Sequence, residues 1–158
     1  MSRIIKAWTA EKLGGDEMPW GNMIIEGKKF LICCGHTGRS PDKKQEYPEA
    51  SERDDFTAAD QAAMVTCPHT MEEQAILCLE KIKASLQAGG TSFENVFWVD
   101  TVVTRRSDRL RASRAMRKWM EKECSEFYKI PRPGFLRVAG LDHPDMLIEI
   151  SMWACIPE

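Results

Sequence analysis

Three charged residues near the end of the chain could hold and hydrolyse a small substrate. Arg132 and Arg137 lie in the stretch IPRPGFLRV, and Glu149 lies in MLIEISMWA. A guanidinium group can hold a carboxylate by two hydrogen bonds, and a carboxylate can orient a water molecule or move a proton. As alternatives, an arginine between prolines can be a solvated loop residue, and a strand glutamate can pair with a basic neighbour.

The two arginines cannot both face one pocket if their strand is regular. Pro133 biases Arg132 toward an extended backbone at a loop edge, whereas Arg137 lies inside the predicted strand. Their odd separation places them on opposite faces. Arg132 is therefore the first candidate for a carboxylate clamp, and Arg137 fits better in an ion pair across the sheet or an interface.

Two Cys-x-His sequences raise further chemistry. One hypothesis is a zinc site, because zinc prefers the soft ligand set of two cysteines and two histidines that Cys34, His36, Cys67 and His69 would supply. Another is a nucleophile and its base, formed by Cys34 and His36. Structural zinc sites usually space their ligands more widely, and a buried cysteine is commonly a small hydrophobe. We therefore expect pocket-lining side chains here and no zinc site.

Charge and composition exclude few classes of function. The chain has 158 residues, a net charge of -2 and a pI near 6.0, so it has no global attraction to nucleic acid or anionic membranes. Six arginines cluster in TRRSDRLRASRAMRK, which leaves nucleic-acid binding as a weak hypothesis. Acidic residues follow at once and no aromatic residues interleave, so this cluster is interpreted as a solvated helix face.

The sequence carries no sign of export or membrane insertion. Its six cysteines lack the spacing of a disulfide framework, and MSRIIKAWTAEKLGG has no long apolar region. No apolar run approaches the ~18 residues of a membrane span. We expect a cytoplasmic protein with reduced thiols and no membrane partner.

The elements that must position these residues follow from periodicity and turn signals. The stretch NMIIEGKKFLICCGH predicts a hairpin. Residues 37–69 predict a long polar loop with one helical turn near 57–63, and NVFWVDTVVT predicts a strand. A T-x-x-E capping box at Thr70 and Glu73 starts one amphipathic helix, and Ser107 is the predicted cap of a second that ends before Pro131.

The last strand divides its residues cleanly between two faces. In MLIEISMWA one face is wholly apolar, while the other carries Glu149, Ser151 and Trp153. The predicted order is β-β-α-β-α-β-β, a single α+β domain spanning residues 1–158 with both helices on one sheet face. The opposite face, with Trp98 or Phe97 and Trp153, is too apolar for water, so we expect a partner chain to cover it.

Together these pieces resemble the Rid (YjgF-like) family of enamine and imine deaminases. The resemblance runs from about Pro19 to Ala154: PW and the hairpin, CCGH at a Ser-Gly-Gln type turn, EEQAILCLEKIKASLQAGG as the Gln-bearing first helix, VFWVDTVV as the central strand and RVAGLDHPDMLIEISMWA as the closing hairpin. It implies a chorismate-mutase-like, ferredoxin-like α+β fold, and a homotrimer with sites in clefts between subunits. It implies no metal and no organic cofactor.

The resemblance also assigns roles to residues. Glu149 matches the family's water-positioning glutamate, whereas the family's carboxylate-binding arginine aligns with Pro133, next to Arg132. Trp20 stands at a pocket tyrosine and Cys34 at a serine. Three further candidates for substrate contact are Gly35, His36 and Arg137.

The leading hypothesis is a cofactor-independent hydrolytic deaminase of a small carboxylate-bearing enamine or imine. The substrate would resemble 2-aminoacrylate or 2-aminomuconate, a product of aromatic-ring cleavage, and the products would be the oxo acid and ammonia. The alternative is a trimeric small-molecule-binding protein of the same fold that does not hydrolyse its ligand.

Overall fold

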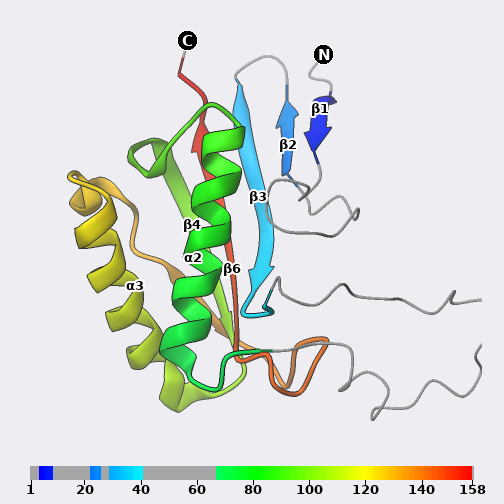
Figure 1. The fold of residues 1–158 in the computed structure, drawn as a ribbon, viewed down its shortest axis with the longest axis vertical. Helices are drawn as coiled ribbons and strands as arrows, with labels where there is room; N and C mark the ends of the chain where they lie inside the picture. The colour runs from blue at the N-terminus through cyan, green and yellow to red at the C-terminus, as the bar shows by residue number, and fades with distance from the viewer. Residues whose placement is uncertain (1–3, 9–21, 26–28, 41–66, 158) are drawn as a thin grey trace, which may run out of the picture.

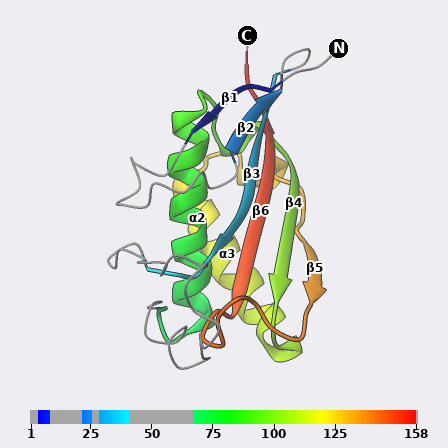
Figure 2. The ribbon, with the colours of Figure 1, turned by 90° about the vertical axis from the view of Figure 1, so that its right-hand side faces the viewer.

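The computed structural model describes residues 4–8, 22–25, 29–40 and 67–157. They form one sheet with the strand order β1-β2-β3-β6-β4-β5, and two helices cover one of its faces (Figure 1, Figure 2). The strands are β1 (Ile4–Trp8), β2 (Asn22–Ile25), β3 (Phe30–Thr37), β4 (Val96–Val103), β5 (Gly134–Arg137) and β6 (Ile148–Cys155). The helices are α2 (Met71–Ala88) and α3 (Arg109–Glu123), with short 3-10 turns η2 (Phe93–Asn95), η3 (Arg106–Asp108) and η4 (Phe127–Lys129). The predicted α+β arrangement is confirmed.

The N-terminal part of the sheet contains the predicted hairpin and one further strand. Ile25 of β2 pairs with Phe30 of β3, so the predicted hairpin pairing is confirmed. Strand β1, which pairs antiparallel with β2, was not predicted. Most of the predicted polar loop, including its helical turn at 57–63, lies outside the described residues.

Helix α2 begins at the predicted capping box. The Glu73 amide donates to Thr70 Oγ1 at 3.2 Å, and the Thr70 amide donates to the Glu73 carboxylate at 3.2 Å. This reciprocal pair satisfies two of the amides that a helix start leaves without partners. The helix then packs over β3 and β6 with a fully buried stripe of Ala75, Cys78, Leu79, Ile82 and Leu86.

Helix α3 begins later than predicted. The chain first makes the 3-10 turn η3, so Ser107 lies inside that turn and is exposed, and Asp108 takes the cap position without a side-chain capping bond. The prediction of Ser107 as the helix cap is therefore wrong. Ala112, Met116 and Trp119 of α3 are buried against the core.

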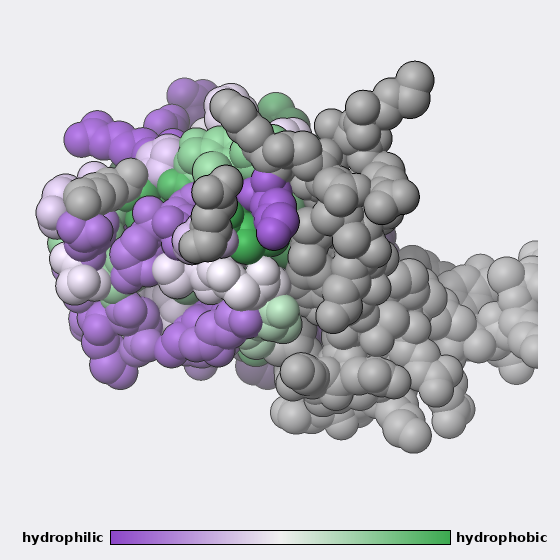
Figure 3. All heavy atoms as spheres, turned by 90° about the horizontal axis from the view of Figure 1, so that it is seen from above, coloured by the Kyte–Doolittle hydropathy of each residue, from purple (hydrophilic) through white to green (hydrophobic). Residues whose placement is uncertain are grey.

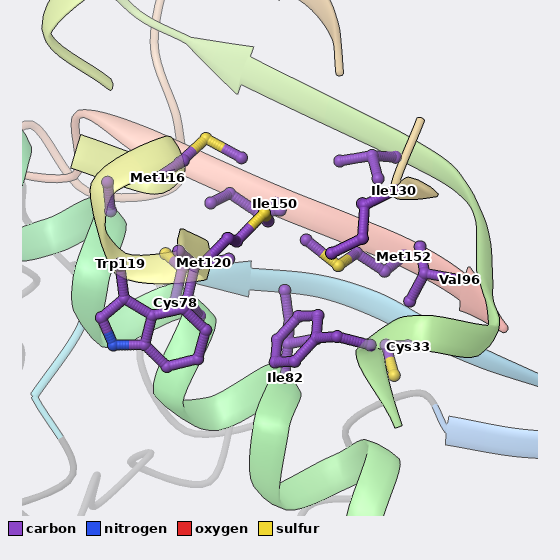
Figure 4. Packing of buried hydrophobic residues seen from close by; sticks show 14 of the residues in the cluster. Cys33, Cys78, Ile82, Val96, Met116, Trp119, Met120, Ile130, Ile150 and Met152 are labelled. Atoms are coloured by element: carbon purple, nitrogen blue, oxygen red, sulfur yellow. The ribbon is translucent and has the colours of Figure 1, made fainter. Parts of the chain in front are cut away.

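The core lies between β6 and the helices. Ile148, Ile150 and Met152 of β6 are fully buried, which confirms the predicted apolar face of that strand. Ile150 and Met152 lie among side chains from both helices, including Ile82 of α2 and Met116 of α3 (Figure 4). The outer surface is different: hydrophilic residues cover most of the described surface visible in Figure 3. None of the described helices is long and apolar enough to cross a membrane.

Candidate active site

The predicted glutamate lies on the sheet face opposite the helices, here called the open face. Glu149 of β6 pairs with Thr37 of β3 on one side and with Val102 of β4 on the other. Val102 in turn pairs with Leu136 of β5. Residues that pair across a sheet point to the same side, so these four side chains form a row across the open face.

A β-bulge in β3 lies beside this row. Cys33 pairs with Met152 and His36 pairs with Ile150, so three steps along β3 match two steps along β6. One extra residue therefore lies in β3, and it breaks the alternation of side chains. Cys33 and His36 both point to the helices and are buried, whereas Cys34 is exposed.

The bulge brings a glycine under the glutamate. A Cβ atom added at Gly35 would lie 1.8 Å from Oε1 and 2.4 Å from Cδ of Glu149. The carboxyl group thus rests directly against the strand backbone, which only a residue without a side chain permits. The structure brings Glu149, Gly35 and Cys34 of the predicted site together.

The surroundings of Glu149 favour its neutral form. Burial raises the pKa of its carboxyl group, and the negative charge of Asp142, in the loop between β5 and β6, raises it further. Burial and the neighbouring Glu149 also raise the pKa of the Cys34 thiol. A carboxyl group with a raised pKa keeps its proton to higher pH than an ordinary glutamate does, which suits it to proton transfer.

The two arginines lie away from this carboxyl group within one chain. Arg137 is exposed on β5 and pairs with Val103, which points to the helices, and Arg132 is exposed just before β5. Strand β4 separates β5 from Glu149, a backbone distance of about 10 Å at the usual strand spacing. In the described part of the chain neither guanidinium group forms an ion pair with Glu149.

His36 lies in a different environment from Cys34. Its Nε2 atom is 3.5 Å from Ser85 Oγ on α2. Burial, together with the nearby Lys81 ammonium group, lowers the pKa of His36 to about 4, so the ring is neutral at physiological pH. The ring therefore packs on the helix side, and its predicted contact with substrate stays a prediction.

An aromatic patch borders the site on the open face. It consists of Phe97, Trp98 and Trp153, with Trp98 52% and Trp153 42% exposed. The Trp98 indole donates to Asp100 Oδ2 at 2.7 Å, and the Phe97 and Trp153 rings meet edge to face with centroids 6.4 Å apart. Trp20, the other predicted pocket aromatic, lies outside the described residues.

Zinc ligation has no support in the part of the chain that the structure describes. No three potential ligand side chains from histidine, cysteine, aspartate or glutamate gather there. Of the first Cys-x-His pair, Cys34 points to the open face and His36 to the helices. The bulge thus also keeps the two from acting as a nucleophile and base.

Sequence reasoning noted a glutamine-bearing helix but assigned no role to its Gln74. Gln74 of α2 is fully buried, and its side chain bonds the loop that leads into β6. Its position gave a signal: it lies three residues after Met71 and four before Cys78, on the apolar stripe of the helix. An amide on such a stripe indicates a buried polar contact.

Comparisons with known proteins identify the fold through structure. No family model matches the chain, and a search of curated proteins found no significant match. A protein of unknown function from Pseudomonas aeruginosa is similar, with a TM-score of 0.66, 23% identity, and coverage of 99% of this chain and 94% of that one.

Two further solved structures carry family names. E. coli TdcF with bound serine has a TM-score of 0.62 and 19% identity, covering 90% of this chain and 91% of its own. YyfA of the Rid family from Yersinia pestis has a TM-score of 0.61 and 15% identity, covering 99% and 100%. The predicted resemblance is confirmed at the level of structure: the chain has the fold of the YjgF and Rid proteins, in a widely diverged sequence.

Proposed function

We propose that the protein is a cofactor-independent deaminase that hydrolyses a small carboxylate-bearing enamine or imine. The fold supports a small-molecule-binding or deaminase function. The observation that carries the finer proposal is the carboxyl group of Glu149, which lies half-buried on the open face against Gly35 with a raised pKa. The serine bound to TdcF supports a ligand that carries both an amino and a carboxylate group.

The chemistry asks for one proton carrier beside the C=N carbon. Protonated Glu149 donates its proton to the methylene carbon of an enamine, which gives the iminium form. As a carboxylate it then takes a proton from the water that adds to the C=N carbon. Glu149 then gives that proton to the nitrogen of the carbinolamine. As ammonia leaves, the hydroxyl proton of the carbinolamine returns to the carboxylate, which yields the oxo acid and restores protonated Glu149.

Binding the substrate carboxylate requires a cation, and among the described residues neither Arg132 nor Arg137 forms an ion pair with Glu149 within one chain. We assign this role to Arg132 of a neighbouring copy in a homotrimer, with the site between subunits. The aromatic patch supports association, because Phe97, Trp98 and Trp153 form a contiguous apolar surface next to the site. Cys34 and Trp20 complete the proposed pocket.

The alternative is a trimeric binding protein that does not hydrolyse its ligand. One observation favours it: Pro133 stands where the resemblance puts the carboxylate-binding arginine, and Arg132 is exposed without contact to Glu149. Such a protein would bind small amino or oxo acids and leave their imines unchanged.

The deciding experiment uses 2-aminoacrylate generated in situ, with decay of the enamine and imine signal followed against the same mixture without protein. The proposal predicts acceleration that Glu149→Gln reduces by about 100-fold, the lower end of what acid–base groups contribute. Glu121→Gln, an exposed glutamate of α3, is the matched control and should retain activity. Decay no faster than buffer with 2-aminoacrylate and 2-aminomuconate, together with measurable binding of an amino or oxo acid, would establish the alternative.

A further inference from the structure

Gln74 bonds three backbone groups from two segments, the chain just before α2 and the loop that leads into β6. Its side-chain amide donates to the carbonyl oxygens of Pro68 at 2.8 Å and Asp145 at 2.7 Å, and its Oε1 accepts from the Leu147 amide at 2.9 Å. Both amide hydrogens and the carbonyl oxygen are thus used, in a side chain with no exposed surface.

The same side chain also lies against the end of β3. A Cβ atom at Gly38 would fall 2.4 Å from Gln74 Oε1 and 2.5 Å from its Cβ and Cγ. Gln74 therefore fixes the spacing between the chain just after Thr37 and the loop that precedes β6. Lys81 also holds the end of β3, by donating to the carbonyl of Thr37 at 3.0 Å, and Gln74 adds the bonds to the loop.

The loop that Gln74 holds carries Asp142 and leads directly to Glu149. Its turn is internally bonded, since the Asp145 amide donates to His143 Nδ1 at 3.1 Å and the Met146 amide donates to the His143 carbonyl at 3.0 Å. A loop bonded in this way moves as a unit, so the contacts at Asp145 and Leu147 also set the position of Asp142.

We propose that Gln74 is a positioning residue for the Glu149 site: its amide bonds the loop carrying Asp142 to the chain before α2, its side chain packs against Gly38 just after β3, and together these contacts fix the surroundings of the carboxyl group. The inference deepens the proposed function and rests on it for its catalytic meaning. Among the residues that the structure describes, the charged and titratable groups that act on Glu149, or that it acts on, are Asp142 from this loop, Cys34 from β3 and Cys78 from α2.

The test replaces Gln74 by methionine, which keeps the length of the side chain and removes all three hydrogen bonds. We expect the pKa of the Glu149 carboxyl group, followed by its side-chain carbon resonance in NMR, to fall toward the ordinary glutamate value as water enters and Asp142 moves away. Gln87→Met, at an exposed position of the same helix, is the matched control and should leave this pKa unchanged. A purely structural role would lower the melting temperature and leave the pKa of Glu149 as it is, which would overturn the proposal.

Two measurements keep the proposal testable if Gln74→Met does not fold. In the unchanged protein the Leu147 amide should exchange its hydrogen slowly, and exchange at the rate of an unstructured amide would contradict the inference. Gly38→Ala pushes on the same side chain from the segment just after β3 and should shift the Glu149 pKa in the same direction. The NMR readout does not depend on turnover, so a protein without deaminase activity that still shows these shifts would sink the proposed function and leave the positioning role intact.

Discussion

The carboxyl group of Glu149 rests on the backbone of Gly35, so closely that a methyl group at position 35 would lie 1.8 Å from Oε1. The contact depends on the bulge in β3, which places this glycine under the middle of β6. The close contact with Gly35 leaves the Glu149 carboxyl group half-buried on the open face.

Gly35→Ala should displace the Glu149 side chain and destabilise the protein by about 1–3 kcal/mol, the usual cost of overpacking. Any deaminase activity should fall with it. Gly140→Ala is the matched control, since a Cβ atom at Gly140 meets nothing within 4 Å. Chemical denaturation and the imine-decay assay measure the two effects, and equal behaviour of the two variants would contradict the close contact.

Glu149→Gln should change how stability depends on pH. Because the folded-state pKa of Glu149 is raised above its ordinary value of 4.5, folding disfavours the carboxylate, and the stability present at low pH is lost as pH rises through the folded value. The glutamine variant has no carboxyl group to ionise and does not lose this stability. The difference between its free energy of unfolding and that of the wild type should therefore increase as pH rises through the folded-state pKa of Glu149. Urea unfolding at several pH values tests the sign, and a constant difference would oppose it.

Cys34 should react slowly for an exposed thiol. Burial and the nearby Glu149 raise the pKa of Cys34, and only the thiolate is alkylated rapidly. Glu149→Gln should therefore shift the pH profile of Cys34 alkylation by iodoacetamide to lower pH. Mass spectrometry reads each cysteine separately: exposed Cys155 serves as the internal control, and buried Cys78, with a pKa of about 12, should stay unmodified.

His36 should make the protein sensitive to mild acid. Its pKa is lowered from 6.5 to about 4 in the folded state, chiefly by burial, so the stability present above pH 6.5 is lost as pH falls toward 4. The loss is at most roughly 1.4 kcal/mol per pH unit. His36→Gln should remove this dependence between pH 7 and pH 5 in urea unfolding. An unchanged slope would mean that the ring is accessible to water in the folded state.

Association through the open face should depend on the aromatic patch. Trp153→Glu places a charge in the centre of that surface and should convert the proposed trimer to monomers, as measured by light scattering after size exclusion. Leu110→Glu, at a 64% exposed position of α3, should leave the assembly unchanged. A wild-type protein that is already monomeric would remove the intersubunit site from the proposed function.

The sequence by itself determined most of the elements and the sides they present. The capping box at Thr70, the buried stripe of α2 and the parity of β6 are local patterns, and a local pattern suffices when one side of a helix or strand must be buried. The alternation of β6 also placed Glu149 on the face away from the helices. The start of α3 was misjudged because a 3-10 turn precedes the helix and includes Ser107, and neither the turn nor the helix begins with a side-chain cap.

The tertiary structure decided what surrounds Glu149. The extra residue in β3 sends Cys34 and His36 to opposite sides, and no periodicity in CCGH reveals a bulge, because its register depends on pairing with β6, more than 100 residues away. The contact with Gly35, the nearness of Asp142 and the bonds of Gln74 likewise join segments distant in the chain. Sequence patterns fix which way a side chain points within its own element, whereas the environment that sets its pKa is formed only when separate elements pack together.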